Sequence, residues 1–128
     1  MAGELESVVR ELFGTFDRKD FDALQRMFTD DVQGVDELSR RWMRGRDAAA
    51  DYFRQFGPII DDLRSEITEV HETVWGDVGI VTAWGEQDYK LQGQQQHISA
   101  PITVVLRRSG GAWRVALIHA VPLPEAPS

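Results

Sequence analysis

Residues 28–36 read Phe-Thr-Asp-Asp-Val-Gln-Gly-Val-Asp, and the stretch ends on Asp36 directly after an apolar residue. Nine residues later, Gly45-Arg46-Asp47-Ala48-Ala49 opens a helical pattern. A carboxylate that the chain carries into an apolar cavity is desolvated, which makes it a competent base near neutral pH. Asp36 is therefore our candidate general base. The alternative interpretation is a loop or cap aspartate on the surface.

The chain around this stretch predicts helices first and strands after. Apolar residues recur at helical spacing over residues 4–17. A second, shorter helix is predicted after Asp20, and a third over residues 46–56, where Gly57-Pro58 ends it. From Leu63 the period changes towards two, with turn signals at Gly76-Asp77, Gly93 and Gly110-Gly111. These turns predict strands over residues 63–75, 78–91, 96–108 and 112–121.

The pattern indicates an α+β domain with three N-terminal helices packed on a strongly curved antiparallel sheet. We expect one domain over residues 1–128, with an ordered core of about 4–121 and an extended tail at 122–128. Two-residue hairpin turns would place Trp84 opposite Thr103 and Thr103 opposite Ile118. Both sheet faces are then apolar, which favours a homodimer that pairs sheet to sheet. A bulge would swap the faces beyond it.

Several short motifs resemble the nuclear transport factor two-like superfamily, which includes ketosteroid isomerases, SnoaL-like polyketide cyclases and limonene epoxide hydrolases. They are residues 28–31, the Gly45 helix start, Ala100-Pro101-Ile102 and the Gly111-Ala112-Trp113-Arg114-Val115 opening of the last strand. The resemblance covers nearly the whole chain and implies a cone-shaped fold around an apolar pocket. In ketosteroid isomerases, the aspartate at the position of Asp36 shuttles the proton.

The departures from the isomerase pattern matter for function. The resemblance puts the isomerase's oxyanion-stabilising tyrosine at Leu12, its supporting tyrosine at Phe53 and its protonated acid at Thr103. Losing one oxyanion donor typically costs about 10²–10³ in rate. Ketosteroid isomerase activity is therefore not expected.

The reactions of other enzymes in this superfamily suggest further candidate catalytic residues. SnoaL-like cyclases use an acidic residue to move a proton, and Glu86 or Asp88 would supply a second carboxylate for this chemistry. The alternative is that Glu86 and Asp88 lie on a solvated strand end without a catalytic role. His119 is a further catalytic candidate, since many SnoaL-like sequences carry a histidine there; a structural histidine is the alternative. Epoxide hydrolases use an Asp-Arg-Asp arrangement, and the predicted face beside Glu86 and Asp88 has no arginine.

The leading hypothesis is binding, and conversion if Asp36 acts as a base, of a small hydrophobic or aromatic molecule. Isomerisation, cyclisation or water addition would be the reaction class. The competing hypothesis is a non-catalytic dimeric binding or association module of the same fold. Our candidate ligand-binding residues are Trp42, Tyr52, Phe53, Trp84, Thr103, Val105 and Ile118.

The composition of the chain limits which classes of partner and cofactor we expect. The net charge of −7 argues against nucleic acid, and the chain has no cysteine for thiol chemistry. The three histidines are too far apart in the predicted register for a metal site, so we expect neither metal nor cofactor. Acidic residues interrupt the start of the chain, and no apolar run reaches about 20 residues. A cytoplasmic location without membrane contact is the default expectation.

Overall fold

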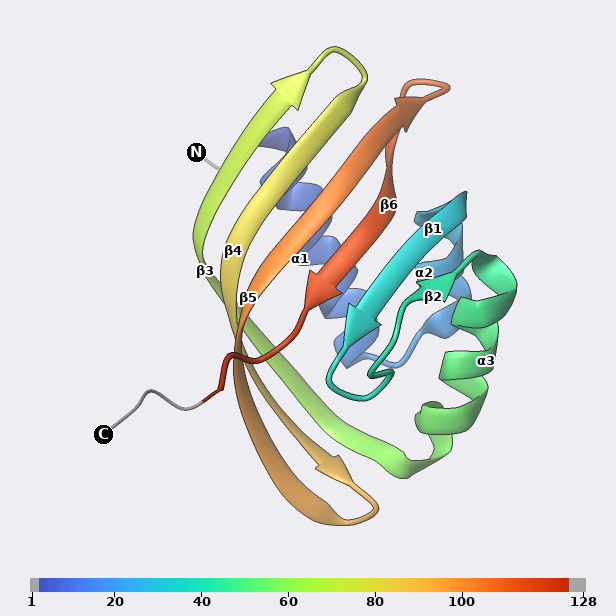
Figure 1. Ribbon diagram of the computed structural model, residues 1–128, viewed down its shortest axis with the longest axis vertical. Helices are drawn as coiled ribbons and strands as arrows, with labels where there is room; N and C mark the ends of the chain where they lie inside the picture. Colours follow the sequence, from blue (N-terminus) through green and yellow to red (C-terminus); the bar gives the residue numbers. More distant parts are fainter. Residues whose placement is uncertain (1–2, 125–128) are drawn as a thin grey trace.

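The computed structural model describes residues 3–124. Those residues form three α-helices, a 3₁₀ turn and six strands (Figure 1). In chain order they are α1 (Glu4–Asp17), α2 (Phe21–Arg26), β1 (Phe28–Asp36), β2 (Met43–Arg44), α3 (Arg46–Phe56), η1 (Gly57–Ile59), β3 (Ile60–Trp75), β4 (Val78–Leu91), β5 (Gln94–Ser109) and β6 (Ala112–Ala120). Residues 121–124 follow without regular structure, and the rest of the predicted tail, 125–128, lies outside the described residues.

The sheet is mixed, with the order β2-β1-β6-β5-β4-β3. β1 runs parallel to β6, and the other neighbours are antiparallel. The expected purely antiparallel, strongly curved sheet was therefore wrong: β1 and β2 were missed, and the sheet is not strongly curled. The cause lies in β1, where Thr29, Asp30 and Asp31 interrupt the apolar alternation that marks a strand.

The predicted helices and the last four strands are confirmed to within a few residues. Asp20 caps α2, because its carboxylate accepts a hydrogen bond from the Ala23 N–H at 3.2 Å. α3 begins after Gly45, whose φ of +86° is a backbone conformation that suits glycine. α3 follows two strands, so the three helices do not all precede the sheet.

The core lies between α1 and one face of the sheet (Figure 1). Leu5, Val9 and Leu12 on α1 are fully buried and belong to one cluster with Val81 and Val104 of the sheet. Full burial of a side chain of this size contributes roughly 1.5–3 kcal/mol. The C-terminal end of α1 is also attached to β3, because Asp17 accepts hydrogen bonds from the Ser65 N–H at 2.9 Å and the Ser65 hydroxyl at 2.7 Å.

The register differs from the simple hairpin expectation at two places. β4 and β5 turn at Gln92-Gly93, so Trp84 lies opposite Pro101 and not opposite Thr103. A bulge interrupts the pairing of β5 with β6 at Val105/Leu106. Beyond the bulge the faces swap, so Ile118 borders the helix-side cavity instead of sharing a face with Trp84.

No helix in residues 3–124 combines the length and the apolar composition that a membrane crossing requires.

Candidate functional site

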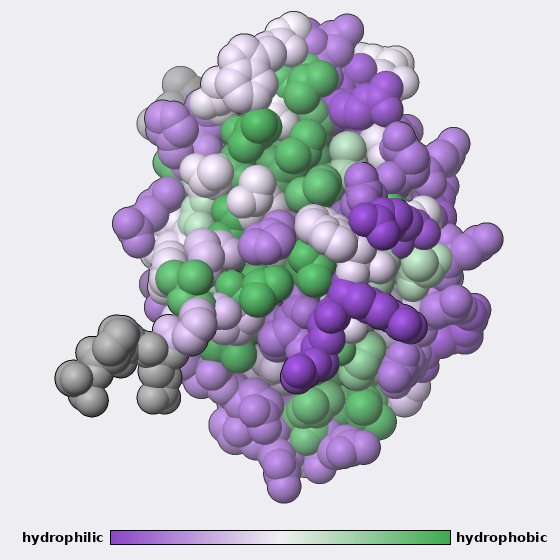
Figure 2. Space-filling model, in the orientation of Figure 1, coloured by the Kyte–Doolittle hydropathy of each residue, from purple (hydrophilic) through white to green (hydrophobic). Residues whose placement is uncertain are grey.

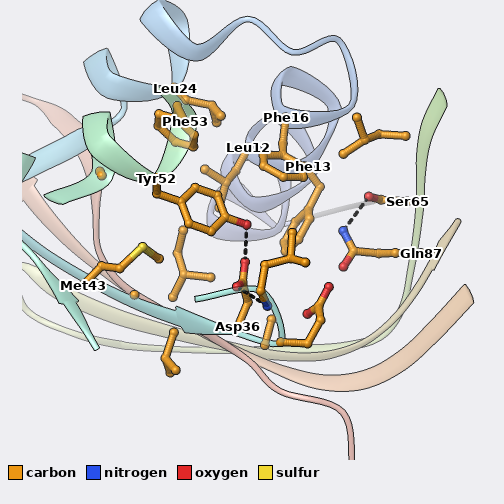
Figure 3. Close-up of a pocket in the computed structure, with 18 of the residues that line it drawn as sticks. Leu12, Phe13, Phe16, Leu24, Asp36, Met43, Tyr52, Phe53, Ser65 and Gln87 are labelled. Atoms are coloured by element: carbon orange, nitrogen blue, oxygen red, sulfur yellow. Dashed lines mark hydrogen bonds between the residues drawn. The ribbon is translucent and has the colours of Figure 1, made fainter. Parts of the chain in front are cut away.

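A cavity of about 120 Å³ lies between the helices and the sheet, beside the end of β1 (Figure 3). Its wall is mostly apolar and comes from α1, α3, β1 and β6, with Leu12, Phe13, Tyr52, Phe53 and Ile118 among the lining residues. Five acidic or amide residues border it as well, namely Gln33, Asp36, Glu37, Gln87 and Asp88. An apolar wall with a few polar groups is the usual character of a small-molecule site.

Asp36 lies in the cavity wall, and both of its carboxylate oxygens are occupied. Oδ1 accepts hydrogen bonds from the backbone N–H groups of Leu38 at 2.9 Å and Ser39 at 2.8 Å. Oδ2 accepts one from the Tyr52 hydroxyl at 2.6 Å (Figure 3). The carboxylate thus stabilises the turn after β1 and links it to α3. Three of the roughly four lone-pair sites of the Asp36 carboxylate are therefore already used.

Tyr52 supplies a hydroxyl close to the place where the isomerase resemblance put Phe53. The residue is buried on α3, and it packs edge-on against the Phe53 ring with centroids 5.6 Å apart. Burial and the neighbouring Asp36 carboxylate raise the pKa of Tyr52 far above its ordinary value. Tyr52 therefore stays protonated at physiological pH and donates a hydrogen bond to Asp36.

Glu37 is a cavity residue that the sequence reasoning missed. Burial, followed by the charge of Asp36, raises the pKa of Glu37 from 4.5 to about 7. The Tyr89 hydroxyl donates to Glu37 Oε1 at 3.1 Å, and burial first, then the Glu37 charge, raise the pKa of Tyr89. The sequence signal that could have revealed Glu37 is the pair of adjacent acids, Asp36 and Glu37, directly after the apolar Val35. Two neighbouring carboxylates repel each other, which favours the protonated form of one of them.

A second series of hydrogen bonds connects β4 to α1 beside the cavity. Gln87 Nε2 donates to the Ser65 hydroxyl oxygen at 3.0 Å (Figure 3). The Ser65 hydroxyl donates onward to Asp17 at 2.7 Å. This series fixes the orientation of the Gln87 amide beside the cavity. The sequence reasoning missed it because its three members lie on three different elements.

The predicted second acids point to the opposite face of the sheet. Glu86 is bonded to the Trp84 indole N–H at 3.0 Å, to the Ser99 hydroxyl and to His97 at 3.0 Å. Hydrogen bonds from Ser99 and Trp84 lower its pKa. Asp88 borders the cavity, yet its carboxylate contacts His97 Nδ1 at 2.7 Å, and this contact raises the pKa of His97. Neither carboxylate faces Asp36, because side chains alternate along β4.

The ligand candidates divide between the two faces. Tyr52, Phe53 and Ile118 line the cavity. The structure corrects the placement of the rest: Trp84, Thr103 and Val105 lie on the sheet face that the helices do not cover, since their neighbours Ile102 and Val104 take the buried face. On that same side, the exposed Trp42 ring approaches the His119 ring, with centroids 6.2 Å apart, so neither candidate meets Asp36.

Within the described residues, no group of three or more histidine, cysteine or acidic side chains could hold a metal ion.

The order of the sheet and its helices defines a nuclear transport factor two-like fold, and solved structures share it. A ketosteroid isomerase-like protein from Erwinia carotovora atroseptica superposes with a TM-score of 0.80 at 22% identity, over 94% of each chain. A CaMKII hub from S. rosetta has a TM-score of 0.80 at 18% identity, over 96% of this chain and 99% of that one. A Catenulispora acidiphila structure in complex with S-DNPA has a TM-score of 0.74 at 17% identity, over 93% and 90%.

A SnoaL-like domain model matches residues 5–123, and the chain belongs to that family. No curated protein matches it significantly. At identities below 25%, the structural neighbours establish the shared fold.

Proposed function

We propose that this protein binds a small hydrophobic or aromatic molecule, about one ring in size, in the cavity beside Asp36. The observation that carries the proposal is the combination of an apolar wall with carboxyl groups at one end. A cavity of about 120 Å³ is close to the roughly 150 Å³ of an apolar cavity that takes benzene. The SnoaL-like family includes cyclases and the wider superfamily includes isomerases, so acid–base conversion of the ligand is the activity to look for.

In this proposal the apolar lining supplies the affinity and the Asp36–Tyr52 pair orients the ligand. Tyr52 and Phe53 place ring faces and edges in the wall, where they pack against an apolar or aromatic ligand. Asp36 holds the turn that carries Glu37, and its bond to Tyr52 fixes the polar end of the cavity. A rigid polar end lowers the entropic cost of orienting a ligand.

We expect Ile118→Trp to weaken the binding of benzyl alcohol by about tenfold or more, because the indole would fill the cavity from β6. Binding is measured from amide chemical shifts in NMR titrations. Leu123→Trp is the matched control, since Leu123 is 63% exposed and lies outside the cavity. A thermal melt confirms that both variants fold. Unchanged binding by folded Ile118→Trp would contradict the cavity as the site.

We also propose that the uncovered sheet face pairs with a second copy of the chain. Trp75 and Val78 are exposed large hydrophobic residues beside the β3–β4 turn, and they pair with each other across the two strands. Trp84 and Val105 are half-buried on the same face, and Figure 2 shows apolar side chains gathered over these strands. A contiguous exposed apolar patch typically marks an interaction surface. The similarity in fold to a CaMKII hub is compatible with this association role.

Val105→Asp is expected to turn a dimer into a monomer, because the paired faces would have to desolvate the new carboxylate. Light scattering after size-exclusion chromatography measures the mass directly. Ser109→Asp, at the exposed end of β5, is the matched control and should leave the mass unchanged. A monomeric wild-type protein at about 100 µM would refute the association and leave the cavity proposal intact.

A further inference from the structure

The hydroxyl groups around the cavity are already used as hydrogen-bond donors. Tyr52 donates to Asp36, Tyr89 donates to Glu37, and Ser65 donates to Asp17. A hydroxyl has one proton to donate. These groups therefore present oxygen lone pairs to anything that enters, and the polar end of the cavity is rich in acceptors.

The two carboxyl groups at that end are not equivalent. Asp36 receives three hydrogen bonds, two of them from backbone N–H groups. Among the side-chain hydrogen bonds that the structure describes for residues 3–124, Glu37 receives one, from Tyr89 at 3.1 Å. Because an ionised carboxylate has about four lone-pair sites, Glu37 keeps most of its capacity for a ligand.

We propose that the cavity selects a hydrophobic ligand whose polar head donates a hydrogen bond, and that Glu37 is the carboxyl that takes the head's proton. The inference rests on the proposed function of the cavity as a small-molecule site. The proton passes from an O–H or N–H of the head to a Glu37 carboxylate oxygen, and the electron pair of the broken bond stays on the head. Asp36 is then a positioning residue, which holds the Glu37 turn.

The charges around Glu37 support this assignment. Asp36 lies next to it in the chain, Tyr52 faces it from α3, Tyr89 from β4, and the exposed Arg64 borders the same cavity from β3. Burial and Asp36 raise the pKa of Glu37 to about 7, against the weaker opposing effects of the Glu37 backbone N–H and of the Tyr89 bond. A group with this pKa exchanges protons at neutral pH, which is what a general base requires.

The first test needs no ligand. The carboxyl ¹³C shift of Glu37, assigned by its loss in Glu37→Gln, should titrate with a midpoint near 7. Asp36→Asn should lower this midpoint by removing a negative neighbour, and Tyr89→Phe should raise it by removing the hydrogen bond. A midpoint below about 5 that ignores Asp36→Asn would overturn the proposal.

The second test uses benzyl alcohol and benzyl methyl ether, which differ in the ability to donate a hydrogen bond. Above pH 7, the wild-type protein should prefer the alcohol by about five- to tenfold, the value of one hydrogen bond. At pH 5 the protonated Glu37 donates to either oxygen, so the preference should shrink. Glu37→Gln should bind both probes with no pH-dependent preference, while Glu66→Gln, an exposed glutamate of β3, should behave as wild type.

The outcomes separate the two proposals. If neither probe binds in the cavity of the wild-type protein, the proposed function fails. If both bind equally at every pH, the cavity is a ligand site and the assignment to Glu37 fails. Retention of the alcohol preference and its pH dependence in Glu37→Gln would also overturn that assignment.

Discussion

Asp36→Ala should lower the free energy of unfolding by about 2–4 kcal/mol. The substitution removes the acceptor for the Leu38 and Ser39 N–H groups and for the Tyr52 hydroxyl. Hydrogen bonds to a charged group each contribute about 1.5–3 kcal/mol, and the orphaned Tyr52 hydroxyl is buried. Urea denaturation at pH 8 measures the effect as a shift of the midpoint.

Asp36→Asn is the matched control for this effect. An asparagine keeps an oxygen that accepts from the two backbone N–H groups, because asparagine makes the same type of turn. Its amide also donates to the Tyr52 oxygen in place of the original bond. We expect a loss of about 1 kcal/mol or less. If Asp36→Ala costs no more than Asp36→Asn, the carboxylate does not hold the turn, and its role as a positioning residue is wrong.

The fold was largely predictable from short-range patterns. Helix α3 follows from its apolar period and from Gly57-Pro58, and β3–β6 follow from alternation and glycine turns. β1 was not predictable in the same way, because its ladder partner β6 lies some 80 residues away in the chain and pairs with it in parallel. Parallel pairing of remote segments leaves no local turn signal.

The candidate site was predicted in part. Asp36, Tyr52, Phe53 and Ile118 lie in the cavity wall, whereas Trp84 and its neighbours lie on the other sheet face. The face of Ile118 depends on one bulge in β6, and a bulge has no reliable mark in a single sequence. Glu37 was missed because its environment comes from Tyr89 and Asp36, and the Tyr89 contact spans 52 positions in the chain.

Glu37→Gln should make the protein more stable at pH 8 and flatten its stability between about pH 4.5 and pH 7. Within that window the folded state keeps the Glu37 proton, whereas the unfolded chain, with a pKa near 4.5, has released it. The unfolded state binds fewer protons, so the stability of the wild type falls as pH rises. The shift from 4.5 to about 7 corresponds to roughly 3–3.5 kcal/mol.

The measurement is the difference in unfolding free energy between wild type and Glu37→Gln at pH 4, 5, 6, 7 and 8. Titrations common to both proteins cancel in this difference, so it isolates Glu37. We expect the difference to shift by about 3 kcal/mol in favour of the variant from pH 4 to pH 8, and to level off above the folded-state pKa. Glu66→Gln should give a nearly flat difference, since Glu66 is exposed on β3. A flat profile for Glu37→Gln would mean that the Glu37 carboxylate is well solvated in the folded state, which would remove the physical basis for its action as a base at neutral pH.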